Sequence, residues 1–229
     1  IKKGKLSMVL YKKNINLQTI VIVFGLLFLT SCNQGPPKEE GEFKESDLVE
    51  LITLDPTFKL DIRYATDNNL VGRPVYTEAR AFLQRPAAEA LVNINSELKP
   101  LGFGLMIFDG YRPWSVTKTF WDITPEEDKI FVADPKEGSR HNRGSAIDLS
   151  LYDLVTGEEV EMTGVYDEMT ERSYPDYEGG TTNQREMRDL LRTKMEAHDF
   201  IVYEFEWWHF DYKDWENYRI ENIPFTEIN

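Results

Sequence analysis

The segment SRHNRGSAID, residues 139–148, combines metal-binding side chains with a glycine that lets the chain bend. His141 and Asp148 carry an imidazole and a carboxylate, both of which zinc accepts as ligands. Gly144 lies between them and frees the backbone to turn from a loop into a strand. A carboxylate inside the apolar run AIDLSL needs a metal or a hydrogen-bond partner if it faces the core. The alternative is a histidine in a surface loop and an aspartate on the solvent face of an antiparallel strand.

A second segment, EFEWWHF at residues 204–210, offers a third ligand and a base. His209 would complete a two-histidine, one-aspartate set and leave the fourth zinc position open for water, as catalytic sites require. Glu206 could take a proton from that water. Residues three apart on a regular strand point to opposite faces, so Glu206 and His209 can converge only through a bulge or a bend. The alternative is an aromatic core strand that ends in a hydrogen-bonded histidine.

Arg112 lies in the turn DGYRP, directly after a predicted buried strand. Its charge and forked donors could stabilise an oxyanion or bind a substrate carboxylate. The alternative is an ordinary loop arginine that pairs with one of the 40 acidic residues of the chain. The third histidine, His198, falls near the end of a predicted helix, and we interpret it as a cation at the helix terminus rather than a ligand.

Taken together, these motifs resemble those of a known family. SRHNRGSAID is similar to S-x-H-x-x-G-x-A-x-D, and EWWH to E-x-W-H, the two signatures of zinc-dependent D,D-peptidases related to the Hedgehog-type fold. The closer resemblance is to the D-alanyl-D-alanine dipeptidases, which the segments DGYRP, ADPKEGSRHNRG and DIRYATDNNLVGRPVY also resemble. The resemblance extends over roughly residues 49–212.

The resemblance implies a role for each residue of the motifs. One zinc ion per chain would be bound by His141, Asp148 and His209. Glu206 would be the general base, and Arg112 would stabilise the oxyanion of the transition state. The expected reaction is hydrolysis of a peptide bond by a metal-activated water.

The substrate that the resemblance implies is a small D-amino-acid dipeptide, D-Ala-D-Ala, which relates to peptidoglycan. Ser139 would contact its carboxylate, and Asp167 would pair with its free ammonium. Tyr64 and Asn69 match the stretch that lines the pocket.

Two other functions stay open. One is a D,D- or L,D-carboxypeptidase acting on muropeptides. The other is a non-catalytic, zinc-stabilised cell-wall binding module, against which the presence of all five residues of catalytic type argues.

The N-terminal residues predict a lipoprotein signal peptide over 1–31. They contain five lysines and no acid, followed by an apolar run at residues 20–29 that is shorter than the roughly 20 residues needed to span a bilayer. The sequence LTSC then resembles a bacterial lipobox, with lipidation expected at Cys32, the single cysteine of the chain. The alternative is a buried N-terminal helix with a chance cysteine. The expected location is therefore the bacterial cell envelope, lipid-anchored in the periplasm or at the surface.

Residues 32–47, rich in Gly, Pro, Glu and Lys, predict a flexible linker after the lipidated cysteine, and residues 48–229 a single domain. The net charge of −14 argues against a nucleic-acid partner. Contact with a membrane is expected through the lipid anchor only, and the sequence predicts no particular oligomeric state.

The hydrophobic patterns mix helices and strands without a regular alternation, so we expect an α+β domain with a central antiparallel sheet flanked by helices. Strands are expected at 60–64, 105–108, 146–152, 201–203 and 207–212. A turn at 156–157 would lead into a return strand over 159–162. Helices are expected from Pro86 to Leu98 and from a capping pair of Asn183 and Glu186 onward.

Overall fold

The computed structural model describes residues 35–69 and 71–228. The expected signal peptide and Cys32 lie outside these residues, so both stay predictions. Within the described part of the chain, no helix combines the length and the apolar character that crossing a bilayer demands.

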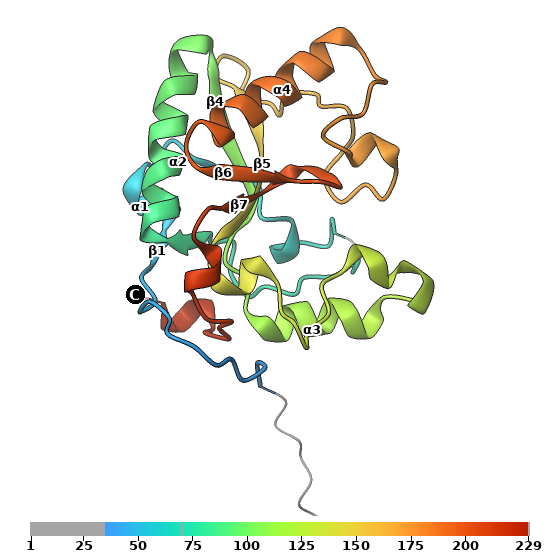
Figure 1. Cartoon of the computed structure of the whole chain (residues 1–229). Helices are drawn as coiled ribbons and strands as arrows, with labels where there is room; N and C mark the ends of the chain where they lie inside the picture. The colour runs from blue at the N-terminus through green and yellow to red at the C-terminus, as the bar shows by residue number, and fades with distance from the viewer. Residues whose placement is uncertain (1–34, 70, 229) are drawn as a thin grey trace, which may run out of the picture. The chain divides into compact units, whose positions relative to one another are not determined.

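A five-stranded sheet carries the core, with the strand order β2-β4-β5-β7-β6 (Figure 1). Its strands are β2 (Lys59–Leu60), β4 (Phe103–Asp109), β5 (Ala146–Asp153), β6 (Phe200–Tyr203) and β7 (Glu206–Tyr212). Neighbouring strands run antiparallel except the edge strand β2, which pairs in parallel with β4. The expected α+β class is confirmed, and β2 is the departure from a purely antiparallel sheet.

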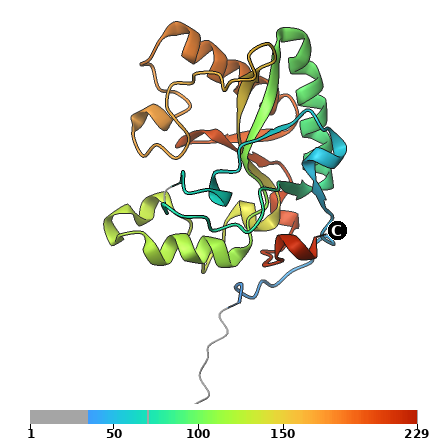
Figure 2. The same ribbon diagram turned by 180° about the vertical axis from the view of Figure 1, so that it is seen from behind.

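Helices α2 (Arg85–Leu98) and α4 (Thr182–Glu196) pack against the sheet, mainly against β4 and β6. Pro86 stands in the first turn of α2, where its missing N–H leaves no intrahelical bond unmade. Helix α3 (Trp114–Ile123) follows the DGYRP turn, and α3 and α4 lie toward opposite ends of β4 and β5 (Figures 1 and 2). The remaining elements are α1 (Leu51–Leu54) and a small sheet of β1 (Leu48–Glu50) and β3 (Phe82–Gln84).

Strand β5 has two buried faces. Ile147 and Leu149 point to one face, while Asp148 and Ser150 point to the other, because side chains alternate along a strand. Asp148 is only 3% exposed. This burial excludes the alternative in which the aspartate sits on a solvent face, so its carboxylate needs partners inside the protein.

A bulge in β4 brings a second aspartate opposite the first. Ile107 pairs with Leu149, but Asp109 pairs with Asp148, so Phe108 is an extra residue in β4. The bulge lies at the end of the strand, where such irregularities commonly re-aim side chains near active sites. The DGYRP turn therefore starts beside the expected metal ligand.

A larger irregularity shapes β7. On β6, Val202 and Tyr203 are adjacent, but their partners on β7 are Phe210 and Glu206. The three residues between these partners, 207–209, therefore oppose a single step of β6. This is the bulge that the three-residue spacing of the EWWH motif requires if its acid and its histidine are to converge.

The strand expected over 60–64 is wrong beyond Leu60. The chain instead makes a 3-10 turn at Arg63–Ala65. The Tyr64 carbonyl accepts the N–H groups of Val75 and Tyr76, both at 2.9 Å, and the Tyr64 side chain is buried. The turn thus directs an aromatic ring inward where a straight strand would have continued along the sheet edge.

The return strand expected over 159–162 is also wrong. The turn forms, with the Gly157 N–H donating to the Asp153 carbonyl at 2.8 Å and Gly157 in the left-handed region at φ 74°. Beyond it, Glu159 makes only an isolated bridge with Tyr152.

The capping pair of α4 is Thr181 with Gln184, in place of the expected Asn183 and Glu186. The Thr181 hydroxyl accepts the Gln184 N–H at 3.2 Å, and the Gln184 side chain accepts the Thr181 N–H at 2.8 Å. Thr181 has the extended backbone that an N-cap adopts, so two otherwise unpaired donors of the first turn are satisfied.

Candidate metal centre

Three buried side chains from the two motifs converge on one point. His141 comes from the 3-10 turn η4 (Arg140–Arg143), Asp148 from β5 and His209 from β7. The Nε2 atom of His141 lies 3.1 Å from His209 Nδ1 and 3.4 Å from Asp148 Oδ1, and His209 Nδ1 lies 2.9 Å from the same oxygen. Asp148 and His209 are register partners on adjacent strands, so the sheet itself brings them together.

Hydrogen bonds on the far side of each ring decide which nitrogen faces this point. His141 Nδ1 donates to the Gly110 carbonyl at 2.8 Å, and His209 Nε2 donates to Asp211 Oδ1 at 3.0 Å. A neutral imidazole carries one N–H, so these partners assign lone pairs to His141 Nε2 and His209 Nδ1. When both rings are neutral, as metal binding requires, these two lone pairs and the Asp148 carboxylate face one point and can bind a cation. Without a metal, the raised pKa of His209 favours a proton at that point.

The spacing and chemistry of the three donors fit a metal such as zinc. Ligands about 2.0–2.1 Å from a tetrahedral metal lie roughly 3.3–3.4 Å from one another. The three observed distances of 3.1, 3.4 and 2.9 Å are close to this value. Two imidazoles and one carboxylate are the donors of catalytic zinc sites, whereas magnesium and calcium favour oxygen alone.

The charges around the donors also favour a cation. Burial lowers the pKa of His209, but Asp211 and Asp148 together raise it well above its ordinary value. Burial by itself raises the pKa of Asp148, but the interactions with His141 and His209 outweigh it, so the pKa of Asp148 lies below its ordinary value. Asp148 is therefore ionised, and the negative field that would otherwise protonate His209 also attracts a metal ion.

Asp211 supports the centre from outside. One of its oxygens accepts the Nε2–H of His209, and the other pairs with Arg140, the neighbour of His141 in the turn η4. A carboxylate behind a ligating histidine fixes the ring and raises its basicity. Asp211 therefore links the two histidine ligands through one ion pair and one hydrogen bond.

Glu206 lies beside the open side of the centre. Its Oε2 is 3.8 Å from His209 Nδ1, and 29% of its side chain is exposed. Burial, with a further contribution from Asp148, raises the pKa of Glu206 above its ordinary value, although His209 lowers it. A carboxylate with a raised pKa is suited to accept a proton and later return it. The bulge in β7 therefore brings Glu206, the expected base, close to His209, as the EWWH spacing required.

Arg112 lies against the same centre with most of its side chain covered. Its Nε and Nη2 atoms bond Asp109 Oδ2 at 2.9 and 2.8 Å, and its Nη2 lies 3.8 Å from Asp148 Oδ2. The rings of Tyr64 and Phe120 lie 5.2 and 5.0 Å from the guanidinium carbon. Arg112 thus pairs with an acid, as the alternative expected, but the pair lies beside the candidate metal ligands and the arginine side chain is only 11% exposed.

Asp167 and Tyr64 lie together near the centre. The Tyr64 hydroxyl is 3.2 Å from both carboxylate oxygens of Asp167. Burial, reinforced by the charges of Asp148 and Glu206, raises the pKa of Asp167 to about 8. Asp167 has a left-handed backbone at φ 62°, which aspartate and asparagine tolerate better than most residues. This is a partly buried carboxylate that a cationic group of a ligand would stabilise.

Three other expected positions have different surroundings. Ser139 is the N-cap of η4, and its hydroxyl accepts the His141 N–H at 3.2 Å. The side-chain amide of Asn69 donates to carbonyls at Arg63, Thr66 and Arg73, and its described contacts hold its own loop. His198 bonds Glu97 at 2.9 Å and is not part of the centre.

Three contributing groups were not assigned a role from the sequence: Asp109, Tyr166 and Asp211. Asp109 accepts from Tyr76 at 2.7 Å as well as holding Arg112, and Tyr166 donates its hydroxyl to Asp148 Oδ2 at 3.0 Å. Asp211 had a readable signal, because it stands two residues after a candidate ligand on a predicted strand and so shares its face. Tyr166 had none, since its partner lies on a different element.

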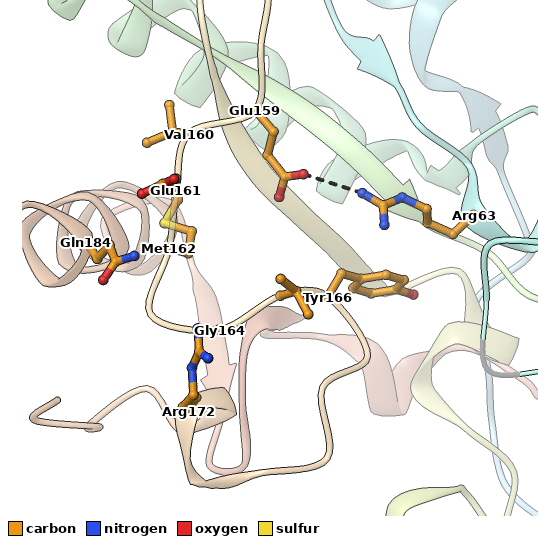
Figure 3. A pocket seen from close by; sticks show the side chains of 10 residues that line it. Arg63, Glu159, Val160, Glu161, Met162, Gly164, Tyr166, Arg172 and Gln184 are labelled. Carbon is orange, nitrogen blue, oxygen red and sulfur yellow. Dashed lines mark hydrogen bonds and ion pairs between the residues drawn. The ribbon is translucent and has the colours of Figure 1, made fainter. Parts of the chain in front are cut away.

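A cavity of about 290 Å³ has Tyr166 among its lining residues (Figure 3). Its charged lining is already paired in part, with Arg63 Nη2 3.4 Å from Glu159 Oε2. Tyr166 lines this cavity and also contacts Asp148, so it forms part of the wall between the cavity and the metal ligands.

The role of Asp211 leads to a prediction about metal affinity. Asp211→Ala removes the acceptor that holds His209 in its ligating tautomer, and we expect zinc to bind about 10- to 100-fold more weakly. The dissociation constant can be measured by competition with a chromophoric chelator. Asp176→Ala, which removes an exposed surface carboxylate, is the control. Equal affinity of the two variants would contradict the role of Asp211.

The sequence of the chain is similar to those of known proteins. The peptidase M15 family model, described as D-Ala-D-Ala dipeptidase, matches residues 44–226. A D-alanyl-D-alanine dipeptidase of Escherichia coli (strain K12) is 34% identical over 166 residues, which cover 72% of this chain and 84% of that protein. One from Enterococcus faecalis (strain ATCC 700802 / V583) is 37% identical over 190 residues, covering 74% and 90%.

Among solved structures, that of the LdcB LD-carboxypeptidase has a TM-score of 0.45 and 22% identity over 78% of this chain and 76% of that one, a likeness too slight to bear on the fold or the substrate. The family match, by contrast, spans both motifs and most of the described residues. The chain therefore belongs to the peptidase M15 family, the D-Ala-D-Ala dipeptidases, and is a metallopeptidase.

Proposed function

We propose that this chain hydrolyses the dipeptide D-Ala-D-Ala to two molecules of D-alanine, with one zinc ion held by His141, Asp148 and His209. The observation that carries the proposal is the convergence of two histidines and an aspartate of metal-binding type beside an acid of raised pKa, Glu206. The relatives are D-alanyl-D-alanine dipeptidases by name, which supports the choice of substrate.

Zinc, when bound, lowers the pKa of water and polarises the peptide carbonyl. Glu206 accepts the proton of the attacking water and then delivers a proton to the leaving amine. The guanidinium of Arg112 is held by Asp109 and faces the site as a fixed positive charge. It can stabilise the oxyanion that develops on the carbonyl without first reorganising.

The ends of the dipeptide are recognised by groups of opposite charge. Asp167 binds the ammonium, with Tyr64 holding its carboxylate in place. Ser139 can donate its hydroxyl proton to the substrate carboxylate, because its oxygen is used as an acceptor by the turn. Asp167 favours a dipeptidase over a carboxypeptidase, since an N-blocked substrate would leave this partly buried acid without a cation.

We propose further that the domain is anchored at the bacterial cell envelope through a lipid on Cys32. The basic flank, the short apolar run and the LTSC sequence support this location. A location outside the cytoplasm suits an enzyme that acts on peptidoglycan-derived dipeptides.

If Glu206 is the base and not a metal ligand, its substitution should impair hydrolysis while leaving zinc binding intact. Glu206→Gln keeps all three ligands, so it should retain one zinc per chain, while kcat falls about 10²- to 10⁴-fold because the proton acceptor is lost. Metal content and alanine release from D-Ala-D-Ala are measured on the same sample. A rate near that of the wild type would refute the assignment.

The raised pKa of Asp167 predicts a pH dependence. The carboxyl is neutral below its pKa of about 8 and ionised above it, so kcat/KM for D-Ala-D-Ala should rise as pH increases toward 8. Above about pH 8 the substrate ammonium itself deprotonates, which should give a falling limb.

Asp167→Asn should remove the rising limb and lower kcat/KM roughly 10- to 100-fold, the loss expected for one hydrogen bond to a charged group. Asparagine tolerates the left-handed backbone, so the fold is retained. An N-acetylated dipeptide is the matched substrate control. An equal loss with both substrates would favour the carboxypeptidase function.

The anchoring proposal predicts a change of cell fraction. In a bacterial host, the wild-type chain should sediment with the membranes, and Cys32→Ala should leave the lipid off and abolish its labelling with a radioactive fatty acid. Unchanged labelling in the variant would show that Cys32 is not the attachment point.

A further inference from the structure

Residues 39–47 lie against the domain as a strap, although the composition of 32–47 predicts a flexible linker. In Figures 1 and 2 this blue segment passes beside the red C-terminal part of the chain. The Lys44 N–H donates to the Asn217 carbonyl at 2.8 Å, and the Ser46 hydroxyl donates to Glu221 Oε2 at 2.9 Å. The Phe43 ring packs 4.3 Å from the guanidinium carbon of Arg219.

Glu39 contacts the turn η4, which carries the candidate ligand His141. Its Oε1 accepts from Arg143 Nη2 at 2.5 Å, and its Oε2 accepts the backbone N–H of Ile220 at 2.7 Å. The side chains of Glu39 and Arg143 are 17% and 12% exposed, so this ion pair is shielded from water. Arg143 is the last residue of η4, the turn that carries the ligand His141.

The C-terminal segment holds the outer side of that turn at several points. The Tyr218 carbonyl accepts from Arg143, and the Glu221 N–H donates to the Asn142 carbonyl at 2.9 Å. Ile220 packs so closely on Gly138 that any side chain at position 138 would collide with it. Glu39 ties this segment to η4, because one carboxylate bonds both Ile220 and Arg143.

We propose that Glu39 is a positioning residue for the metal ligand His141, acting through Arg143 and Ile220. The strap is then a working part of the enzyme, although the family match begins only at residue 44. The inference rests on the proposed metal centre, and it adds a residue from outside the matched region. Without Glu39, Arg143 loses its carboxylate partner and keeps the Tyr218 carbonyl, while the Ile220 N–H loses its acceptor, and the turn gains freedom.

The test compares four variants of the full chain: Glu39→Ala, Glu39→Gln, Glu40→Ala and Lys44→Ala. Glu40 is the exposed neighbour of Glu39, and Lys44 makes a strap contact with Asp214, away from η4. Zinc affinity is measured by competition with a chromophoric chelator. Hydrogen exchange of the Asn142 and Gly144 amides is measured on the metal-free protein, and thermal unfolding is recorded for each variant.

Glu39→Ala should weaken zinc binding roughly 2- to 30-fold and speed exchange of both amides. Glu39→Gln should fall between, because its amide oxygen still accepts from Ile220 but lacks the charge that Arg143 needs. Glu40→Ala and Lys44→Ala should stay within about twofold of the wild type, whatever their melting temperatures.

Unchanged zinc affinity in Glu39→Ala, or an equal loss in Lys44→Ala, would overturn the inference and leave the strap a purely structural feature. A wild-type chain that binds no zinc would instead overturn the proposed function. In that case the exchange of the two amides still decides whether Glu39 orders the turn.

Discussion

The site depends on one electrostatic constraint. Three candidate donor atoms, from His141, Asp148 and His209, lie 2.9 to 3.4 Å from one another. The Gly110 carbonyl and the Asp211 carboxylate hold the two rings in the tautomers that create this arrangement. Two lone pairs and a carboxylate at such distances need a positive charge, either a metal ion or a proton on His209, and the surrounding hydrogen bonds orient the candidate ligands before any metal binds.

The fold satisfies this constraint with irregular features of a regular sheet. Adjacent strands bring Asp148 and His209 together by register, and the long bulge in β7 turns Glu206 toward the same point. The bulge in β4 sets the turn that carries Arg112. His141 comes from a short 3-10 turn, whose position depends on contacts with distant parts of the chain. The regular strands β5 and β7 therefore carry two candidate ligands, Asp148 and His209. The short turn that carries His141 depends on tertiary contacts for its position.

Much of the site could be predicted from the sequence because its residues lie in two compact motifs. The spacing of EWWH even required the bulge that β7 contains. Other parts depend on contacts between distant residues, which no local pattern reports. The bond between Glu39 and Arg143 joins residues 104 apart, and the bond from Tyr64 to Asp167 joins residues 103 apart. The composition of residues 32–47 predicts a solvated linker, but hydrogen bonds hold residues 39–47 against the domain.

The most direct test of the account is the release of D-alanine from D-Ala-D-Ala as zinc is titrated into the metal-free chain. With a single zinc site, the rate should rise in proportion to added zinc and saturate at one ion per chain. Hydrolysis that proceeds without zinc, or zinc binding that saturates without release of D-alanine, would contradict it.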